Sequence, residues 1–228
     1  MFANDWRMPR FLFPLLLVAA TAAVVHADAP TFVGSAQIEQ DQSDPSGKRW
    51  ILLSDLKFIK DGQTWITKKG DKTDGASIPR ALWTLVGSPF TGLYVRAALI
   101  HDHYCQKEHR VRTWEETHLM FYDAMIAGGV DPISANTMYY GVYCCGPKWA
   151  KLAPGVPCGR GCIMNTPVGA QNFQPSEVDE TSDREIEEAA KLIKERAATA
   201  TPMTLEELRQ RANERGANPF DARGNFIQ

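Results

Sequence analysis

The sequence predicts an α+β fold in which a small antiparallel sheet is followed by a cluster of three or four helices and a charged helical C-terminal tail. Strand-like stretches separated by turn residues occupy residues 31–69. From Pro79 onward, apolar residues recur every three or four positions, a spacing that is typical of helices packed on a core. After Pro167 charged residues dominate. These observations place the sheet first, the helices second and the tail last.

The first 27 residues have the features of a secretory signal peptide. Arg7 and Arg10 precede an apolar run over 11–25, and Val25-His26-Ala27 places small residues at both positions that determine cleavage. We therefore expect cleavage after Ala27 and export to the periplasm or the medium. The run is shorter than the roughly 20 residues of a bilayer span, and no later segment approaches that length. The alternative is that the segment is retained as an N-terminal anchor.

Length and charge limit the classes of domain and partner. About 200 residues remain after the leader, enough for one globular domain, predicted over 28–166, and a tail over 167–228. The formal net charge is −2. Because basic residues are not in excess, we do not expect nucleic acid as a partner. For an exported chain, an envelope component or a lipid is the partner class that we expect.

The predicted sheet has three strands, over 32–38, 50–59 and 64–68. Asp44-Pro45-Ser46-Gly47 and Lys60-Asp61-Gly62 separate these strands. Both are turn sequences, because glycine supplies positive φ and aspartate caps its own turn. Successive strands joined by short turns predict antiparallel pairing.

Four helices are predicted in the cluster. A short helix begins at Pro79, which suits a first helical turn, and stops at Gly87-Ser88-Pro89. The three longer helices cover about 93–105, 113–127 and 134–145. Thr113 and Glu116 form a capping box at the start of the second of these, and Gly128-Gly129 ends it.

The tail is predicted to contain two solvent-facing helices, over 182–197 and 204–215. Each starts with a capping box, Ser182 with Glu185 and Thr204 with Glu207. Their sparse apolar positions would bury only a narrow stripe. The end of the chain, 218–228, is predicted to be loose.

Five cysteines follow the leader: Cys105, Cys144, Cys145, Cys158 and Cys162. Thiols of an exported chain tend to pair, and an odd number leaves at least one over. Cys158 and Cys162 can close a small local loop, whereas Cys105 could reach Cys144 or Cys145. The alternative is a zinc knuckle built from the last four cysteines, although adjacent cysteines depart from the usual ligand spacing.

The first candidate for reaction chemistry is the pair His101-Asp102, at the end of an apolar helical run. Ionisable groups in such a run indicate a functional site or a buried polar network. His101 shares a helix face with Ala97, Ala98 and Cys105, so a second helix can approach closely. A suitably held imidazole is a general base near neutral pH. The alternative is a structural histidine hydrogen-bonded to the loop at 73–75.

Two further residues complete the candidate catalytic set. Asp102 lies about 100° around the helix from His101 and could bind calcium together with carbonyl oxygens near Asp74 or in 87–92; the alternative is a salt bridge or a cap. His118 falls on an apolar helical stripe and could lie opposite His101 if the two helices pack antiparallel. With Asp102, two imidazoles could instead ligate zinc.

The segment Thr73 to Arg80 is predicted to be a structural loop. It lacks the strand, elbow and helix frame of a serine hydrolase. Asp74 or Ser77 is expected to cap the helix that starts at Pro79, and Gly75 to supply an unusual backbone angle. Arg80, like Arg96 and Arg112, is expected to anchor the loop through charge-assisted hydrogen bonds or to meet an anionic headgroup.

Residues of about 50 to 150 resemble the bacterial and phage family called domain of unknown function 1353. The resemblance rests on 73–80, on His101-Asp102 followed by Tyr104, and on further positions: Arg112, Phe121, Met125, Gly129-Val130 and Met138-Tyr139. Membership implies no activity. Members usually have an aspartate in the third helix where this chain has His118.

A local stretch is also similar to the secreted phospholipases A2, which place His-Asp on an apolar helix shortly before a tyrosine. This resemblance implies a base at His101, a calcium ligand at Asp102 and, at His118, the position of the carboxylate that orients the base. One hypothesis is therefore a hydrolase of lipid or other ester substrates. The other is a non-catalytic envelope or phage-derived interaction module in which His101-Asp102 is structural.

Overall fold

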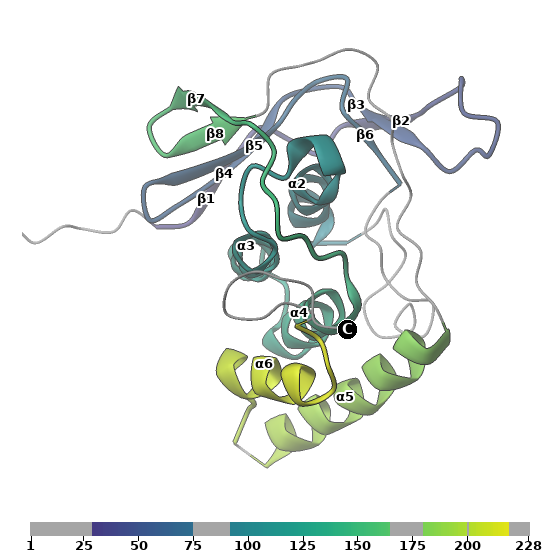
Figure 1. The fold of residues 1–228 in the computed structure, drawn as a ribbon, viewed down its shortest axis with the longest axis vertical. Helices are drawn as coiled ribbons and strands as arrows, with labels where there is room; N and C mark the ends of the chain where they lie inside the picture. Colours follow the sequence, from purple (N-terminus) through teal and green to yellow (C-terminus); the bar gives the residue numbers. More distant parts are fainter. Residues whose placement is uncertain (1–28, 75–91, 165–179, 200, 219–228) are drawn as a thin grey trace, which may run out of the picture.

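The computed structural model describes residues 29–74, 92–164, 180–199 and 201–218. It confirms the α+β class, with two small sheets followed by helices (Figure 1). The predicted signal segment, the short helix at Pro79 and the end of the chain from 219 lie outside these residues. No helix in the described ranges combines the length and the apolar character that a membrane crossing requires.

The eight strands of the described residues form one five-stranded and one three-stranded sheet. In the larger sheet the order is β1-β4-β5-β8-β7, and all pairings are antiparallel except that of β5 with β8. The smaller sheet has the antiparallel order β2-β3-β6. The strands are β1 Thr31–Val33, β2 Ile38–Gln40, β3 Trp50–Leu52, β4 Leu56–Lys60, β5 Gln63–Thr67, β6 Lys72–Thr73, β7 Val156–Gly159 and β8 Cys162–Met164.

The predicted strands 32–38 and 50–59 are each divided into two, which corrects the prediction of three continuous strands. Phe32 pairs with Phe58 in the larger sheet, whereas Ile38 pairs with Leu52 in the smaller sheet. Both segments therefore pass from one sheet to the other. At the bend, Gly34 has φ +97° and lies against the Asp55 carbonyl, where any side chain would collide. Glycine at position 34 therefore permits this close backbone approach.

The predicted hairpin turn at Asp61-Gly62 is confirmed. Both residues have positive φ, 50° and 74°, as a tight turn between twisted antiparallel strands requires. The hairpin of β7 and β8 was not predicted. It joins the edge of the larger sheet through the parallel pairing of Thr64 with Cys162, almost 100 residues away in the sequence, so local pattern could not place it.

The described residues contain five α-helices. Three lie between β6 and β7, and two follow β8: α2 Val95–Cys105, α3 Trp114–Ala127, α4 Pro132–Cys145, α5 Glu180–Ala198 and α6 Leu205–Glu214. The capping boxes at Thr113 and Thr204 are confirmed. Helix α4 begins two residues before its predicted start, because Asp131 accepts a hydrogen bond from the Ser134 amide and Pro132 fits the first turn.

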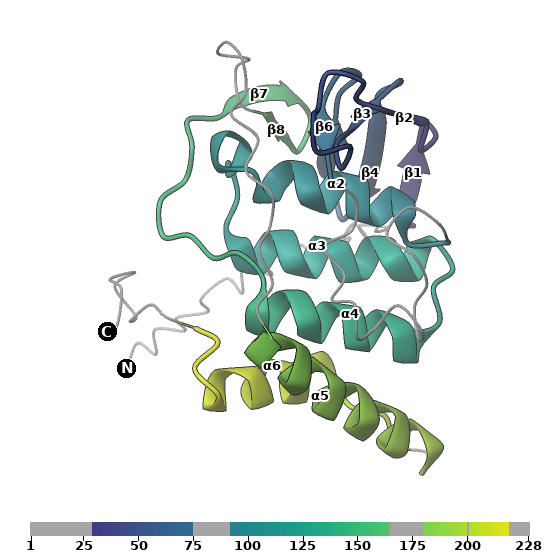
Figure 2. The ribbon, with the colours of Figure 1, turned by 90° about the vertical axis from the view of Figure 1, so that its right-hand side faces the viewer.

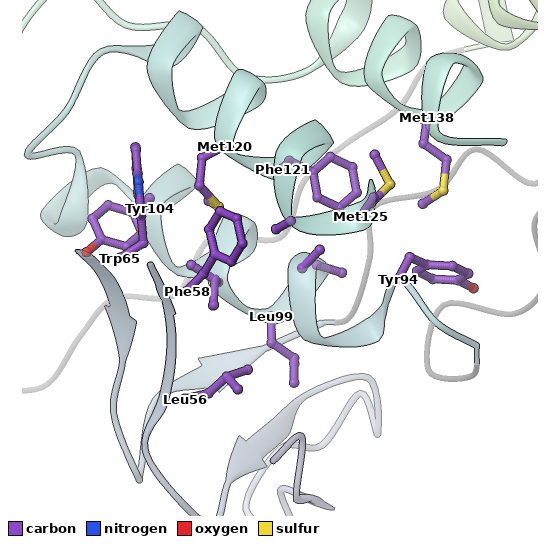
Figure 3. Packing of buried hydrophobic residues seen from close by; sticks show 14 of the residues in the cluster. Leu56, Phe58, Trp65, Tyr94, Leu99, Tyr104, Met120, Phe121, Met125 and Met138 are labelled. Carbon is purple, nitrogen blue, oxygen red and sulfur yellow. The ribbon is translucent and has the colours of Figure 1, made fainter. Parts of the chain in front are cut away.

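The elements are stacked in layers. The sheets cover one side of α2, and α3 and α4 follow in turn, with short connections at alternate ends that make neighbouring helices antiparallel (Figure 2). Helices α5 and α6 cover the far side of α4. The main core lies between the sheets, α2 and α3, where Phe58, Trp65, Leu99, Tyr104 and Phe121 pack together (Figure 3).

Helices α5 and α6 attach firmly to α4 through the narrow apolar stripe that the sequence indicates. Ile193 and Leu208 are each 1% exposed and pack in a cluster with Tyr139 and Tyr143 of α4. At the edge of this cluster, the Glu185 carboxylate accepts hydrogen bonds from Tyr140, Arg211 and Arg215. The apolar stripe of α5 and α6 thus extends the core, while the charged faces of these helices are exposed.

Replacing Ile193 by alanine is expected to lower the free energy of unfolding by about 2–4 kcal/mol, because a buried side chain is removed and a cavity remains. Chemical denaturation followed by circular dichroism measures this change. Ile126, on α3 and 40% exposed, is the matched control, and Ile126→Ala should change stability by less than about 0.5 kcal/mol. Equal effects of the two substitutions would show that α5 does not stabilise the fold.

Candidate functional site

His101 on α2 and His118 on α3 meet at the interface of the two helices. Nε2 of His101 lies 2.8 Å from Nδ1 of His118, and the two rings share a hydrogen bond. His101 is 8% exposed and His118 is fully buried. The predicted antiparallel packing thus brings together the two histidines, and it does so without a carboxylate between them.

Aromatic side chains enclose the two imidazoles. The His101 ring stacks on Phe121 with centroids 4.6 Å apart, and Trp114 meets the His118 ring edge-to-face at 5.6 Å. Burial lowers the pKa of His101 to about 3. Burial, reinforced by His101 itself, also lowers the pKa of His118 well below its ordinary value. Both rings are therefore neutral near pH 7, and one donates its proton to the other.

Asp102 points to a different part of the protein. Its carboxyl group accepts hydrogen bonds from the Thr73 side chain and from the Asp74 backbone, and it is 7% exposed. Burial, followed by the nearby Asp74 charge, raises the pKa of Asp102 well above its ordinary value. Its Oδ2 has no hydrogen-bond partner among the described residues. The sequence allowed a hydrogen bond between His101 and the loop at 73–75. In the structure it is Asp102 that bonds to Thr73 and Asp74.

Cys105 lies one helical turn after His101, and its Sγ is 3.5 Å from His101 Nε2. It is a free, buried thiol among the described residues. The pairing of Cys105 with Cys144 or Cys145 is therefore wrong, because Cys105 faces α3 while the other two form a disulfide with each other at the end of α4. The closeness of Cys105 to His101 could be read from the sequence, since residues four apart share a helix face.

Cys158 and Cys162 form the predicted local disulfide, which closes the β7-β8 hairpin. Since all four cysteines after Cys105 are paired in disulfides, the alternative of a four-cysteine zinc knuckle is wrong.

A second polar cluster, which was not predicted from the sequence, lies on the opposite side of α2. Nδ1 of His103 lies 2.8 Å from the Asp71 carboxylate, and the His103 ring stacks on His109 with centroids 3.9 Å apart. Burial, followed by His103, lowers the pKa of His109 to about 4, against the opposing charge of Asp71. The position of His103 in the sequence indicates this separate cluster, because the residue lies about 200° around the helix from His101.

Of the predicted loop residues, Asp74 is described and lies beside Asp102, while Gly75, Ser77 and Arg80 lie outside the described residues. Arg112 was expected to anchor the segment Thr73 to Arg80, and the contacts of its side chain are with other segments. It donates a 2.8 Å hydrogen bond to the Gly161 carbonyl and stacks over the Trp65 ring at 4.5 Å. Arg112 therefore links the β7-β8 hairpin to β5.

A surface hollow lies beside the β4-β5 hairpin and α3. Lys60, Asp61, Glu116 and Asp123 line its rim, and Lys60 pairs with Asp123 at 2.6 Å. Its lining includes none of His101, Asp102 and His118. The hollow and the histidine pair are therefore separate features.

The fold and the site define a small α+β domain whose central helix carries buried polar side chains, and comparisons with known proteins identify its family. Residues 50–142 match the family described as "Protein of unknown function (DUF1353)". The chain is 40% identical over 192 residues to "Uncharacterized protein y4iH" from Sinorhizobium fredii (strain NBRC 101917 / NGR234), an alignment that covers 82% of this chain and 79% of that protein. The chain belongs to this family.

A second relative from the same organism shares a smaller part. "Uncharacterized protein y4jT" is 42% identical over 121 residues, which cover 49% of this chain and 35% of that protein. The chain thus aligns with about a third of the longer relative. No solved structure matches this chain. The similarity to phospholipases A2 finds no support in these comparisons.

At pH 7 the free energy of unfolding of Asp102→Asn is expected to equal or exceed that of the wild type. The amide can still accept the hydrogen bonds from Thr73 and Asp74, and it removes a buried carboxyl group that Asp74 repels. Asp102→Ala should lose about 1–3 kcal/mol, because both donors are left without an acceptor. Urea denaturation measures both changes, and a large loss in Asp102→Asn would show that the negative charge itself is required.

His109 is expected to make the protein less stable as the pH falls from 6.5 toward 4. The unfolded chain takes up this proton near pH 6.5, whereas the folded protein does so only near pH 4, so acid favours unfolding in this interval. His109→Gln should reduce the pH dependence of the unfolding free energy by up to about 1.4 kcal/mol per pH unit. The Ile126→Ala control should keep the wild-type slope; an unchanged slope in His109→Gln would contradict the assignment.

Proposed function

We propose that this chain is an exported, non-catalytic domain that serves as an envelope interaction module, in which His101-Asp102 holds the fold together. One observation carries this proposal: the two adjacent side chains bind different partners inside the protein. His101 joins α2 to α3 through His118, and Asp102 joins α2 to the end of β6 through Thr73. A pair that served one reaction centre would converge on one point.

The geometry of His101 argues against the hydrolase hypothesis. A general base must reach a water or substrate hydroxyl and must gain basicity from an acceptor on its other side. Here His101 Nε2 is occupied by His118, the ring is enclosed, and a pKa of about 3 makes it a poor base at neutral pH. His118 also cannot supply the carboxylate that orients the base in phospholipases.

Calcium binding at Asp102 is the second element of the hydrolase hypothesis. Calcium takes six to eight oxygen ligands, whereas the Asp102 carboxyl already accepts hydrogen bonds from Thr73 and the Asp74 backbone. A structural role for Asp102 therefore accounts for its contacts without an ion. Calorimetric titration of calcium into the wild type and into Asp102→Asn distinguishes the two roles, since saturable binding that is lost in the variant would favour the hydrolase.

Two features support export. The leader over 1–27 has the pattern of a signal peptide. In addition, the pairs Cys144–Cys145 and Cys158–Cys162 are disulfides, which persist in oxidising compartments. Fractionation of cells that express the full chain, with mass spectrometry of the mature N-terminus and of the cysteine pairs, tests this part. Recovery of an uncleaved chain in the cytoplasm would contradict it.

His101→Gln and His118→Gln are each expected to destabilise the protein by about 1–3 kcal/mol, because each leaves a buried imidazole without its partner. The double variant should be less destabilised than the sum, since the two residues interact directly. Neither substitution should change hydrolysis of phospholipid vesicles or simple esters, which should stay at the background rate in the wild type. Measurable wild-type hydrolysis that His101→Gln abolishes without loss of stability would refute the non-catalytic proposal.

A further inference from the structure

We propose that His101, Cys105 and His118 form a buried site for a single copper(I) ion. This inference goes beyond the proposed structural role and does not rest on it. Among the described residues these three provide two imidazole nitrogens and one thiol sulfur that all lie within 4.8 Å of one another. They come from two packed helices, so the site is built by the α2-α3 interface itself.

The distances are close to those of a trigonal metal site. With bonds of about 2.0 Å to nitrogen and about 2.3 Å to sulfur, three-coordinate geometry places the nitrogens about 3.5 Å apart and each nitrogen about 3.7 Å from the sulfur. His101 Nε2 is 3.5 Å from Cys105 Sγ and 2.8 Å from His118 Nδ1. The third distance, between the ligand atoms of His118 and Cys105, is within 4.8 Å. Binding thus requires that the two imidazoles separate by about 0.7 Å and give up their shared hydrogen bond, while all three side chains close around the ion.

The chemistry of the three ligands favours copper(I) over other ions. Thiolate and imidazole ligands suit soft and borderline metals, whereas calcium and magnesium prefer oxygen. Zinc in structural sites takes four ligands, and here the described residues offer three. Copper(I) can bind with three ligands. The Cys105 thiolate would balance its single positive charge. A site without net charge suits an enclosure made of Phe121 and Trp114.

The Cys105 sulfur can serve as a metal ligand in its deprotonated form. Binding of the ion would release the thiol proton to solvent, because the thiolate is the form that coordinates. The thiol is also kept from disulfide formation, because the other four cysteines are paired with each other.

The test is a titration of the purified chain, with both disulfides intact, by copper(I) under ascorbate and in competition with bicinchoninate. A thiol count on the denatured protein, with one thiol expected, shows that only Cys105 is free. We expect one equivalent of copper(I) to bind, and X-ray absorption to show one sulfur and two nitrogen neighbours. Absence of stoichiometric binding, or a metal with only nitrogen and oxygen neighbours, would overturn the proposal.

Variants assign the ligands. Cys105→Ser and His118→Gln should each weaken copper(I) binding at least tenfold, while His109→Gln, which alters a buried histidine outside the cluster, should bind as the wild type does. If His118→Gln fails to fold, Cys105→Ser and the sulfur signal still decide, because a thiol buried for packing alone would give no copper-sulfur neighbour. A parallel zinc titration separates the metals, and zinc binding without copper(I) binding would overturn the copper assignment.

The two proposals fail by different results. If the wild type does not bind copper(I), the expected stability loss of His101→Gln and the expected absence of hydrolysis still stand. Hydrolysis by the wild type would contradict the non-catalytic role without affecting the measured metal stoichiometry.

Discussion

The structure depends on the burial of α2. All nine residues from Ala97 to Cys105 are buried, because the sheets cover one side of this helix and α3 covers another. A helix in this position must satisfy every polar side chain inside the protein, since unpaired buried polar groups are costly. Four successive residues, His101 to Tyr104, are polar or carry a polar group, and each finds a partner elsewhere in the chain.

These four contacts explain how the layers are held together. His101 reaches α3 at His118, Asp102 reaches Thr73 at the end of β6, and His103 pairs with Asp71 just before it. The Tyr104 hydroxyl accepts a hydrogen bond from the Ile66 amide of β5 and donates to the Ile163 carbonyl of β8. One helical turn of polar residues thus connects both sheets to the helix stack.

A buried polar network and a metal site are compatible uses of the same residues. The imidazole pair stabilises the interface in the absence of metal, and Cys105 adds the third ligand from the adjacent turn of the same helix. Because the two histidines come from different helices, ion binding would strengthen the link that their hydrogen bond already makes. The ligand set is therefore inseparable from the packing of α2 on α3.

Local features could be predicted from the sequence by itself. The capping boxes at Thr113 and Thr204, the Asp61-Gly62 turn and the Cys158–Cys162 loop all involve residues at most four positions apart, and backbone geometry fixes such contacts. The common face of His101 and Cys105 is of the same kind. Helix positions and the α+β class followed from periodicity, since apolar spacing reports which face is buried.

Tertiary structure alone decided what each buried face meets. The division of 32–38 and 50–59 between two sheets depends on which strands pair, and the place of β8 depends on pairing with a strand almost 100 residues earlier. Likewise, spacing put His101 and Asp102 on different sides of α2, but only packing determined that one meets His118 and the other Thr73. The reason is physical: helical geometry fixes the direction of a side chain, whereas its partner is set by long-range burial.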